Sequence, residues 1–131
     1  MLRPSLVDPR ESVPLLVRHL EETDYEFLDD HIDILESAII FVCRNHEEIG
    51  GFIWYYQSES DETHWIVHMS VSESYKRRFF SRHLITSMFG ACYALGANVI
   101  IAEDASQELL ARIGGKYHDG EVILELPFIW R

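Results

Sequence analysis

Residues 65–102 read WIVHMSVSESYKRRFFSRHLITSMFGACYALGANVIIA, and this stretch decides the fold. Its two ends, residues 65–71 and 98–102, are short and rich in β-branched or aromatic side chains, as buried strands are. Between them, residues 76–96 place apolar side chains at helical spacing, and Gly96 is suited to end a helix. The predicted inward stripe is Phe80, Leu84, Met88, Cys92 and Leu95, with Ile85 and Phe89 beside it. Strand, helix and strand in this order predict a right-handed crossover between two parallel strands of one sheet.

The flanking segments extend this unit on both sides. Residues 2–6 predict an edge strand, and Ser12 with Pro14 predicts the start of a first helix. Later segments predict a second helix over 24–37, a hairpin of 39–44 and 51–56, a short helix over 106–113 ended by Gly114-Gly115, and a hairpin of 116–118 and 122–126 turned by Asp119-Gly120. The predicted fold class is therefore α/β (α+β): one domain over residues 1–131, with a mixed central sheet, helices on both faces, and the order β-α-α-β-β-β-α-β-α-β-β.

Composition limits the partners of this chain. It has 131 residues, of which 22 are acidic and 11 are Lys or Arg, so the formal net charge is −11. That charge argues against general nucleic-acid binding and against an anionic membrane as partner. Cys43 and Cys92 lie among apolar residues, which predicts buried thiols in a reducing compartment. The start lacks the pattern of a secretion signal and no apolar run is long enough to span a bilayer, so we expect a cytoplasmic protein.

One short segment opposes the general charge. Residues 75–82, YKRRFFSR, contain four cations and no acid. Either these cations pair with the acidic N-terminal region, or they hold an anion.

Residues 71–85, VSESYKRRFFSRHLI, resemble without gaps the acetyl-CoA segment of the GNAT superfamily of N-acetyltransferases. In that family a strand-end Val and a few polar residues lead through Tyr-Arg into a basic Gly-x-Gly loop that opens a helix. Residues 2–11 and 105–114 are similar to the family's opening passage and to its following short helix. The resemblance implies the fold described above, and in an active member it implies that acetyl-CoA contacts Val71, Lys76, Arg77, Arg78, Ser81 and Arg82.

The chain departs from the family where chemistry is expected. Arg77, Phe79 and Ser81 stand where the loop has glycines, and a phenylalanine ring at 79 would block the approach of a pyrophosphate to the backbone. Leu110 stands where the family carries the tyrosine that protonates the leaving thiolate. The weak candidates for a base are Glu73 and His68. His64 and His68 would lie ~13 Å apart on one strand, too far to share a metal ion, so no metal site is predicted.

These departures lead to a main hypothesis and to alternatives. The main hypothesis is a non-catalytic GNAT-fold protein that has no cofactor and binds other proteins. It resembles the head-assembly or DNA-ejection factors of short-tailed bacteriophages. Such a protein is expected in the host cytoplasm or in the virion. The alternative is an N-acetyltransferase that binds acetyl-CoA through an altered pyrophosphate loop, with the side chains of Lys76, Arg77, Arg78 and Arg82 on the phosphates. A nucleic-acid module is the least favoured, because of the −11 charge. The apolar end, residues 126–131, is expected either to dock as an edge strand or to complete a partner's surface.

Overall fold

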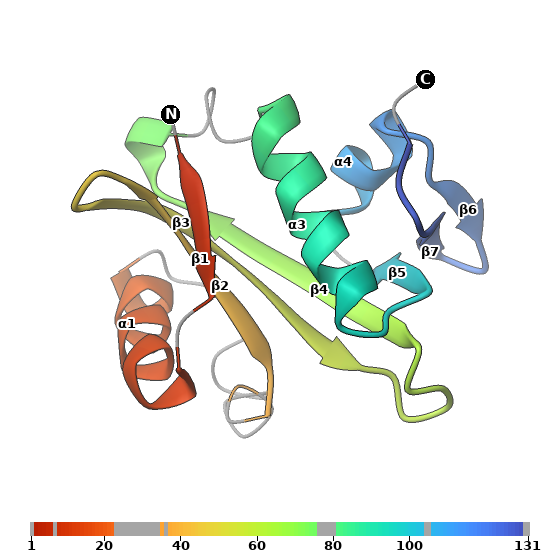
Figure 1. Ribbon diagram of the computed structural model, residues 1–131, viewed down its shortest axis with the longest axis horizontal. Coiled ribbons are helices and arrows are strands. Elements are labelled where there is room, and N and C mark those ends of the chain that lie inside the picture. Colours follow the sequence, from red (N-terminus) through yellow and green to blue (C-terminus); the bar gives the residue numbers. More distant parts are fainter. Residues whose placement is uncertain are drawn as a thin grey trace. The chain divides into compact units, whose positions relative to one another are not determined.

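The computed structural model describes residues 2–6, 8–22, 35, 37–75, 81–103 and 106–129. Their α-helices and strands, labelled in Figure 1, are β1 (Arg3–Leu6), α1 (Pro9–Glu22), β2 (Ile39–Asn45), β3 (Glu48–Gln57), β4 (His64–Val71), α3 (Arg82–Ala94), β5 (Val99–Ala102), α4 (Gln107–Arg112), β6 (Lys116–His118) and β7 (Glu121–Glu125). A 3₁₀ turn, η1 (Glu73–Tyr75), follows β4. The chain forms two compact units. The first unit is Met1–Tyr56 with Met69–Ser81, and the second unit is Gln57–His68 with Arg82–Arg131.

The strands form a mixed sheet. Among the described residues, seven strands are hydrogen-bonded in the order β1-β2-β3-β4-β5-β7-β6. β4 and β5 are parallel, whereas β1 with β2, β2 with β3, β5 with β7 and β6 with β7 are antiparallel. The parallel pair connected through α3 is the crossover that residues 65–102 predict, and the predicted fold class is confirmed. The prediction of one domain over residues 1–131 stays a prediction.

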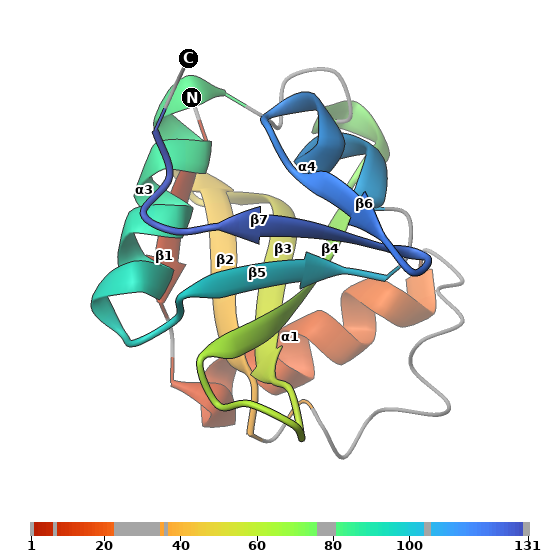
Figure 2. The same cartoon turned by 90° about the vertical axis from the view of Figure 1, so that its right-hand side faces the viewer.

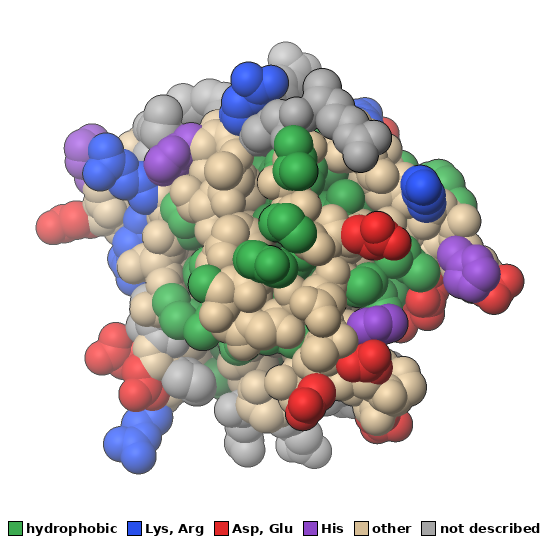
Figure 3. Space-filling model, turned by 45° about the vertical axis from the view of Figure 1, so that its right-hand side comes forward, with side chains coloured by type: hydrophobic (Ala, Val, Ile, Leu, Met, Phe, Trp, Pro, Cys, Tyr) green, Lys and Arg blue, Asp and Glu red, His purple; other side chains and the backbone are tan. Residues whose placement is uncertain are grey.

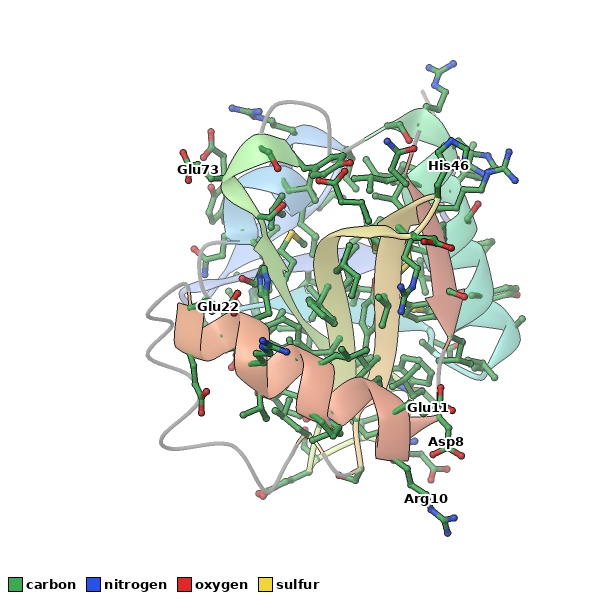
Figure 4. All side chains as sticks on the ribbon, turned by 90° about the vertical axis from the view of Figure 1, so that its left-hand side faces the viewer. Asp8, Arg10, Glu11, Glu22, His46 and Glu73 are labelled. Carbon is green, nitrogen blue, oxygen red and sulfur yellow. The ribbon has the colours of Figure 1, made fainter. Side chains whose placement is uncertain are left out.

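In the first unit, α1 packs on the β2–β3 hairpin. Figure 4 shows α1 lying across these strands, with His46 at the tip of the hairpin. The helix turns one apolar face inward because Leu16 and Leu20 recur four residues apart, and both are fully buried. The core they join also contains Leu35, Ala38, Ile40, Val42, Phe52 and Trp54. Hydrophobic burial on one helix face and one sheet face holds this unit together.

The start of α1 differs from the prediction. Asp8, not Ser12, caps the helix: its Oδ1 accepts the backbone N–H of Arg10 at 2.8 Å, and Pro9 is the first helical residue. Ser12 is fully buried inside the helix, where its Oγ donates to the Asp8 carbonyl. Ser12 with Pro14 and Asp8 with Pro9 are both a capping residue followed by a proline, which is typical of a helix start. The helix begins at the earlier pair. The predicted second helix over 24–37 lies outside the described residues apart from Leu35 and Ser37.

In the second unit, α3 buries Leu84, Met88 and Cys92 of the predicted stripe, and Phe80 lies outside the described residues. The helix ends in a Schellman motif: Gly96 has φ +112°, Gly96 N donates to the Tyr93 carbonyl at 3.1 Å, and Ala97 N donates to the Cys92 carbonyl at 3.0 Å. Leu95 was expected to face inward but is 52% exposed, because it follows the last helical residue. The exposed large hydrophobic side chains of this unit are Tyr93, Leu95, Tyr117 and Ile129, and Figure 3 shows that hydrophobic side chains reach the surface among polar ones.

The C-terminal hairpin of this unit is confirmed. Asp119 (φ 48°) and Gly120 (φ 83°) turn β6 into β7, which Figure 2 shows alongside β5. After β7 the chain does not continue as an edge strand. Leu126 N donates to the Asn98 carbonyl at 2.9 Å, and the Phe128 ring packs against Phe89 of α3 with centroids 5.5 Å apart. None of the helices in the described parts of the chain has the length and apolarity needed to cross a membrane.

Candidate functional site

The parallel strands β4 and β5 pair only over a short distance. Their register joins three residue pairs and ends at Ile66 with Ile101, although β4 continues to Val71. At the next residue of β4, the Val67 carbonyl accepts the Ser106 hydroxyl at 3.4 Å, from the residue that precedes α4. Beyond Ile66, therefore, β4 has no partner residue in β5. Where two neighbouring strands stop pairing, the backbone of either strand can pair with an extended, amide-bearing molecule.

In the first unit, the chain that leaves β4 is anchored at Tyr75. Ser72 donates to the Gly50 carbonyl of β3 twice, from its backbone N–H at 2.9 Å and from its Oγ at 3.1 Å. Tyr75 is 4% exposed, its N–H donates to the Ser72 carbonyl, and its Oη accepts the Asn45 amide at 3.3 Å. Gly50 packs closely here, because a Cβ would lie 2.5 Å from Leu2 Cδ2 and 3.1 Å from Tyr75 Cγ, so one of these side chains would have to move. The backbone that enters residues 76–80 is therefore held in a fixed place and direction at Tyr75.

The helix that follows those residues favours an anion at its start. The first turn of α3 contains no acidic residue and begins with Arg82, which is exposed. The positive end of the helix dipole adds to the guanidinium charge. Among the coenzyme contacts implied by the resemblance, Val71 ends β4, and Ser81 and Arg82 lead into α3. Lys76, Arg77, Arg78 and Phe79 lie outside the described residues, so the steric argument at Phe79 stays a prediction.

The two predicted base candidates lie in different surroundings. His68, on β4 and in the second unit, is 5% exposed. Glu73, on η1 and in the first unit, is exposed, and Figure 4 shows its carboxylate directed away from the strands. Within the described ranges, no group of three or more His, Cys, Asp or Glu side chains is placed to hold a metal ion.

The end of α4 is closely packed at Leu110 and Gly115. Leu110 is fully buried, so this position serves packing. Gly114 has φ +115°, and Gly115 N donates to the Leu110 carbonyl at 2.8 Å in a second Schellman motif. A Cβ at Gly115 would lie 2.7 Å from both the Leu110 carbonyl oxygen and Val122 Cγ1. Any side chain at 115 would therefore collide with backbone.

One polar pair, His19 with Ser70, was not predicted from the sequence. His19 of α1 places Nε2 2.8 Å from Ser70 Oγ on β4, and its ring lies 5.0 Å from that of Phe52. Burial lowers the pKa of His19, and the nearby Glu22 carboxylate opposes this in part. The available signal was that His19 lies one turn after Leu16 and beside Leu20, on the inward face of an amphipathic helix.

Comparison with known sequences identifies the family. The sequence model of the acetyltransferase (GNAT) family matches residues 6–114. The chain belongs to the GNAT family. Among curated proteins, none matches this sequence.

Solved GNAT structures share the fold at low identity. An acetyltransferase of the GNAT family from Staphylococcus aureus has a TM-score of 0.68 at 11% identity, covering 96% of this chain and 99% of its own. The Bacillus subtilis acetyltransferase in complex with CoA has a TM-score of 0.64 at 14% identity, covering 96% and 99%. An acetyltransferase from Thermus thermophilus has a TM-score of 0.68 at 16% identity, covering 96% and 97%. At such low sequence identities, these structures show only that the fold is shared. The family assignment rests on the sequence match over residues 6–114.

The main functional hypothesis is wrong. A non-catalytic phage assembly factor is contradicted by the family match and by structural neighbours that are described as acetyltransferases. The error came from giving two local departures, at Phe79 and Leu110, more weight than a pattern that extends over most of the chain. The alternative, an N-acetyltransferase, agrees better with these findings. Protein partners and the cytoplasmic location stay predictions.

Proposed function

We propose that this GNAT protein transfers an acetyl group from acetyl-CoA to an amine, using a pyrophosphate segment that relies on side-chain cations instead of glycines. The observation that carries the proposal is the family match over residues 6–114. The anchored turn at Tyr75 supports it, because it sets the direction of the chain into the cationic segment.

The chain's own residues fit this coenzyme in two ways. The pantetheine arm of CoA contains two amide groups, which can pair with the β4 backbone past Ile66 and up to Val71. Lys76, Arg77, Arg78 and Arg82 supply the charges for the phosphates, and arginine can bind phosphate through two parallel hydrogen bonds. When bound, acetyl-CoA supplies a thioester carbonyl that an amine can attack.

Binding is the first test. If acetyl-CoA binds the folded state alone, a free concentration 100 times Kd adds about 2.7 kcal/mol to the free energy of unfolding. A clear rise in Tm with acetyl-CoA, and none with adenosine alone, is expected. No rise at millimolar acetyl-CoA would overturn the proposal.

Release of CoA thiol in the presence of an amine is the second test. A thiol reagent suits this protein, because the thiols of Cys43 and Cys92 are both buried. Burial raises the pKa of Cys43 to about 12, which keeps it in the unreactive thiol form. The protein alone should therefore give little background, and thiol release that requires both acetyl-CoA and an amine would support transfer.

Phe79→Gly tests the altered segment. Removing the ring should tighten CoA binding, because steric relief of about 1–3 kcal/mol corresponds to roughly 5- to 150-fold in Kd. Phe79→Leu keeps most of the bulk and is the control. Calorimetric titration with CoA measures both variants. If Phe79→Gly and the wild type bind equally, the ring does not obstruct the phosphates.

A further inference from the structure

The exposed surface of α3 differs from the rest of the chain in its lack of charge. Of all residues in the chain 25% are charged, yet residues 84–102 contain no Asp, Glu, Lys, Arg or His. This range includes all of α3 after Arg82 and His83. The segment that follows β7, residues 126–129, has no charged side chain either. The face that a helix turns to water normally carries charged and polar side chains, so the surface of α3 is unusual for this protein.

The uncharged segment after β7 lies along α3. Leu126 N donates to the carbonyl of Asn98, which follows the end of the helix, and the Phe128 ring packs against Phe89 in the middle of the helix. The segment therefore runs back beside α3 toward the helix start, as Figure 2 shows. Tyr93 lies one helical turn after Phe89 on the same side of α3. The helix and the segment thus present a continuous surface.

Large apolar side chains are exposed on this surface. We call it the α3 face, and it consists of exposed uncharged residues: Thr86, Gly90, Tyr93, Ala94, Leu95 and Ile129. In the described part of the chain, five large hydrophobic side chains are exposed, and three of them lie here: Tyr93 (48%), Leu95 (52%) and Ile129 (70%). Figure 3 views this side of the second unit and shows hydrophobic side chains down its middle, with charged side chains to either side. Contiguous apolar surface with a polar rim marks an interaction site.

The charges of the chain indicate what covers this face. A partner that is recognised through its charge would need opposite charges on the α3 face, and residues 84–102 and 126–129 supply none. With a net charge of −11, two copies of the chain repel each other where their acidic surfaces meet, and this repulsion is weakest at an uncharged face. An uncharged face is also complementary to itself, as the contact between two identical surfaces requires.

The size of the face sets the strength of such a contact. A stable interface buries about 800 Å² on each partner, which is about a tenth of the 8146 Å² of accessible surface of this chain. With 13 residues, α3 is about 20 Å long, and one side of it supplies only part of that area. The segment with Ile129 therefore has to contribute, and we expect a weak dimer with a Kd in the micromolar range.

We propose that the α3 face is the contact surface of a homodimer, in which two copies of this chain pack their uncharged surfaces together about a twofold axis. The inference is independent of the proposed acetyl transfer. Tyr93 lies about 16 Å along the helix axis from Arg82, at the opposite end of α3 from the start to which we assign the coenzyme. Dimer formation and coenzyme binding can therefore be measured separately.

Sedimentation velocity of the full chain, over about 5 to about 500 µM protein, tests the dimer. The wild type should shift from monomer toward dimer as its concentration rises. Tyr93→Lys should weaken this association at least about tenfold, because it places an unpaired charge in the interface. Tyr117→Lys is the matched control: Tyr117 is 70% exposed on β6, outside the α3 face, and the same change of charge there should leave the dimer Kd unchanged.

Two further measurements identify the surface that is used. Ile129→Lys should weaken the dimer as Tyr93→Lys does, and both variants should keep the wild-type Tm at low protein concentration because the substituted side chains are exposed. Raising NaCl from about 0.05 to about 0.5 M should strengthen the dimer, because salt screens the repulsion between two acidic copies.

Several results would overturn the homodimer. These are a wild type that stays monomeric at every concentration, a dimer that Tyr117→Lys weakens as much as Tyr93→Lys, and a dimer that salt dissociates, since its interface would then depend on charge pairs. Binding of monomeric wild type to phosphatidylcholine vesicles, lost in Tyr93→Lys, would assign the α3 face to a membrane instead of to a second copy.

Discussion

At the residue scale, two effects shift the pKa of His19 in opposite directions. Desolvation against Phe52 disfavours the imidazolium, and Glu22 favours it, with desolvation the larger effect. The sequence marks His19 as inward-facing through its helical spacing, but it does not identify Ser70 as the partner. His19 and Ser70 are 51 residues apart in the sequence, and local sequence patterns do not predict such a long-range contact.

The lowered pKa of His19 predicts a pH effect on stability. The folded pKa lies below the ordinary value of 6.5, so near that pH the unfolded state binds more protons than the folded state. The contribution of His19 is therefore fully present above about pH 6.5 and is lost as pH falls through the folded pKa. Urea unfolding between about pH 5 and about pH 8 should show a steeper loss for the wild type than for His19→Gln. His118→Gln should keep the wild-type slope; identical slopes for wild type and His19→Gln would contradict the prediction.

At the element scale, the two Schellman motifs fix where α3 and α4 end. Both use a glycine with positive φ, Gly96 and Gly114, and both positions are visible in the sequence as Gly after an apolar helical pattern. Gly115 is different, because it lacks a positive φ and there is no space around it for a side chain. Leu110 and Val122 close around it, and the second of these comes from β7.

Gly115→Ala should destabilise the fold by about 1–3 kcal/mol, because the added Cβ meets the Leu110 backbone and Val122. Gly90→Ala is the matched control. Gly90 is an exposed position within α3 at which an added Cβ has nothing within 4 Å, so this change should stabilise by about 0.5–1 kcal/mol. Chemical denaturation of both variants measures the difference. A neutral Gly115→Ala would mean that α4 and β7 adjust at little cost.

Much of the element order was predictable because alternation, helical spacing and turn residues are local signals. The β4–α3–β5 crossover and the Asp119-Gly120 hairpin were both predicted correctly. The start of α1 was not, because Asp8-Pro9 and Ser12 with Pro14 are two competing local signals. The end of the β4–β5 pairing at Ile66 was not predictable either, because local sequence patterns do not give the length over which two strands pair.

At the scale of the whole molecule, the local departures at Phe79 and Leu110 favour a non-catalytic protein, whereas the sequence match over residues 6–114 places the chain in the acetyltransferase (GNAT) family. A misplaced ring changes an affinity by a few kcal/mol, whereas the GNAT pattern is distributed over residues 6–114. Such a distributed pattern survives local change. A glycine missing from the loop therefore indicates a different way of binding phosphate and does not indicate that phosphate binding is lost.

The charge distribution of the whole chain makes a final prediction. The net charge of −11 repels CoA, whereas the four cations of residues 75–82 attract it. Salt screens both effects, so it would strengthen CoA binding if the repulsion dominated and weaken it if the attraction dominated. The cations dominate at contact distance, because Coulomb energy falls with separation and the acids are spread over the chain. CoA affinity should therefore fall between about 0.05 and about 0.3 M NaCl.

Arg82→Gln identifies the cations responsible. It should weaken CoA binding at low salt and flatten the salt dependence, because it removes one of the four positive charges of residues 75–82. Arg112→Gln changes the net charge by the same amount on α4, where Arg112 is paired with Glu108, and should leave the salt dependence unchanged. Calorimetric titration across the salt range compares the two. Equal effects of both variants would mean that CoA responds to total charge, and affinity that rises with salt would mean that the acidic surface controls binding.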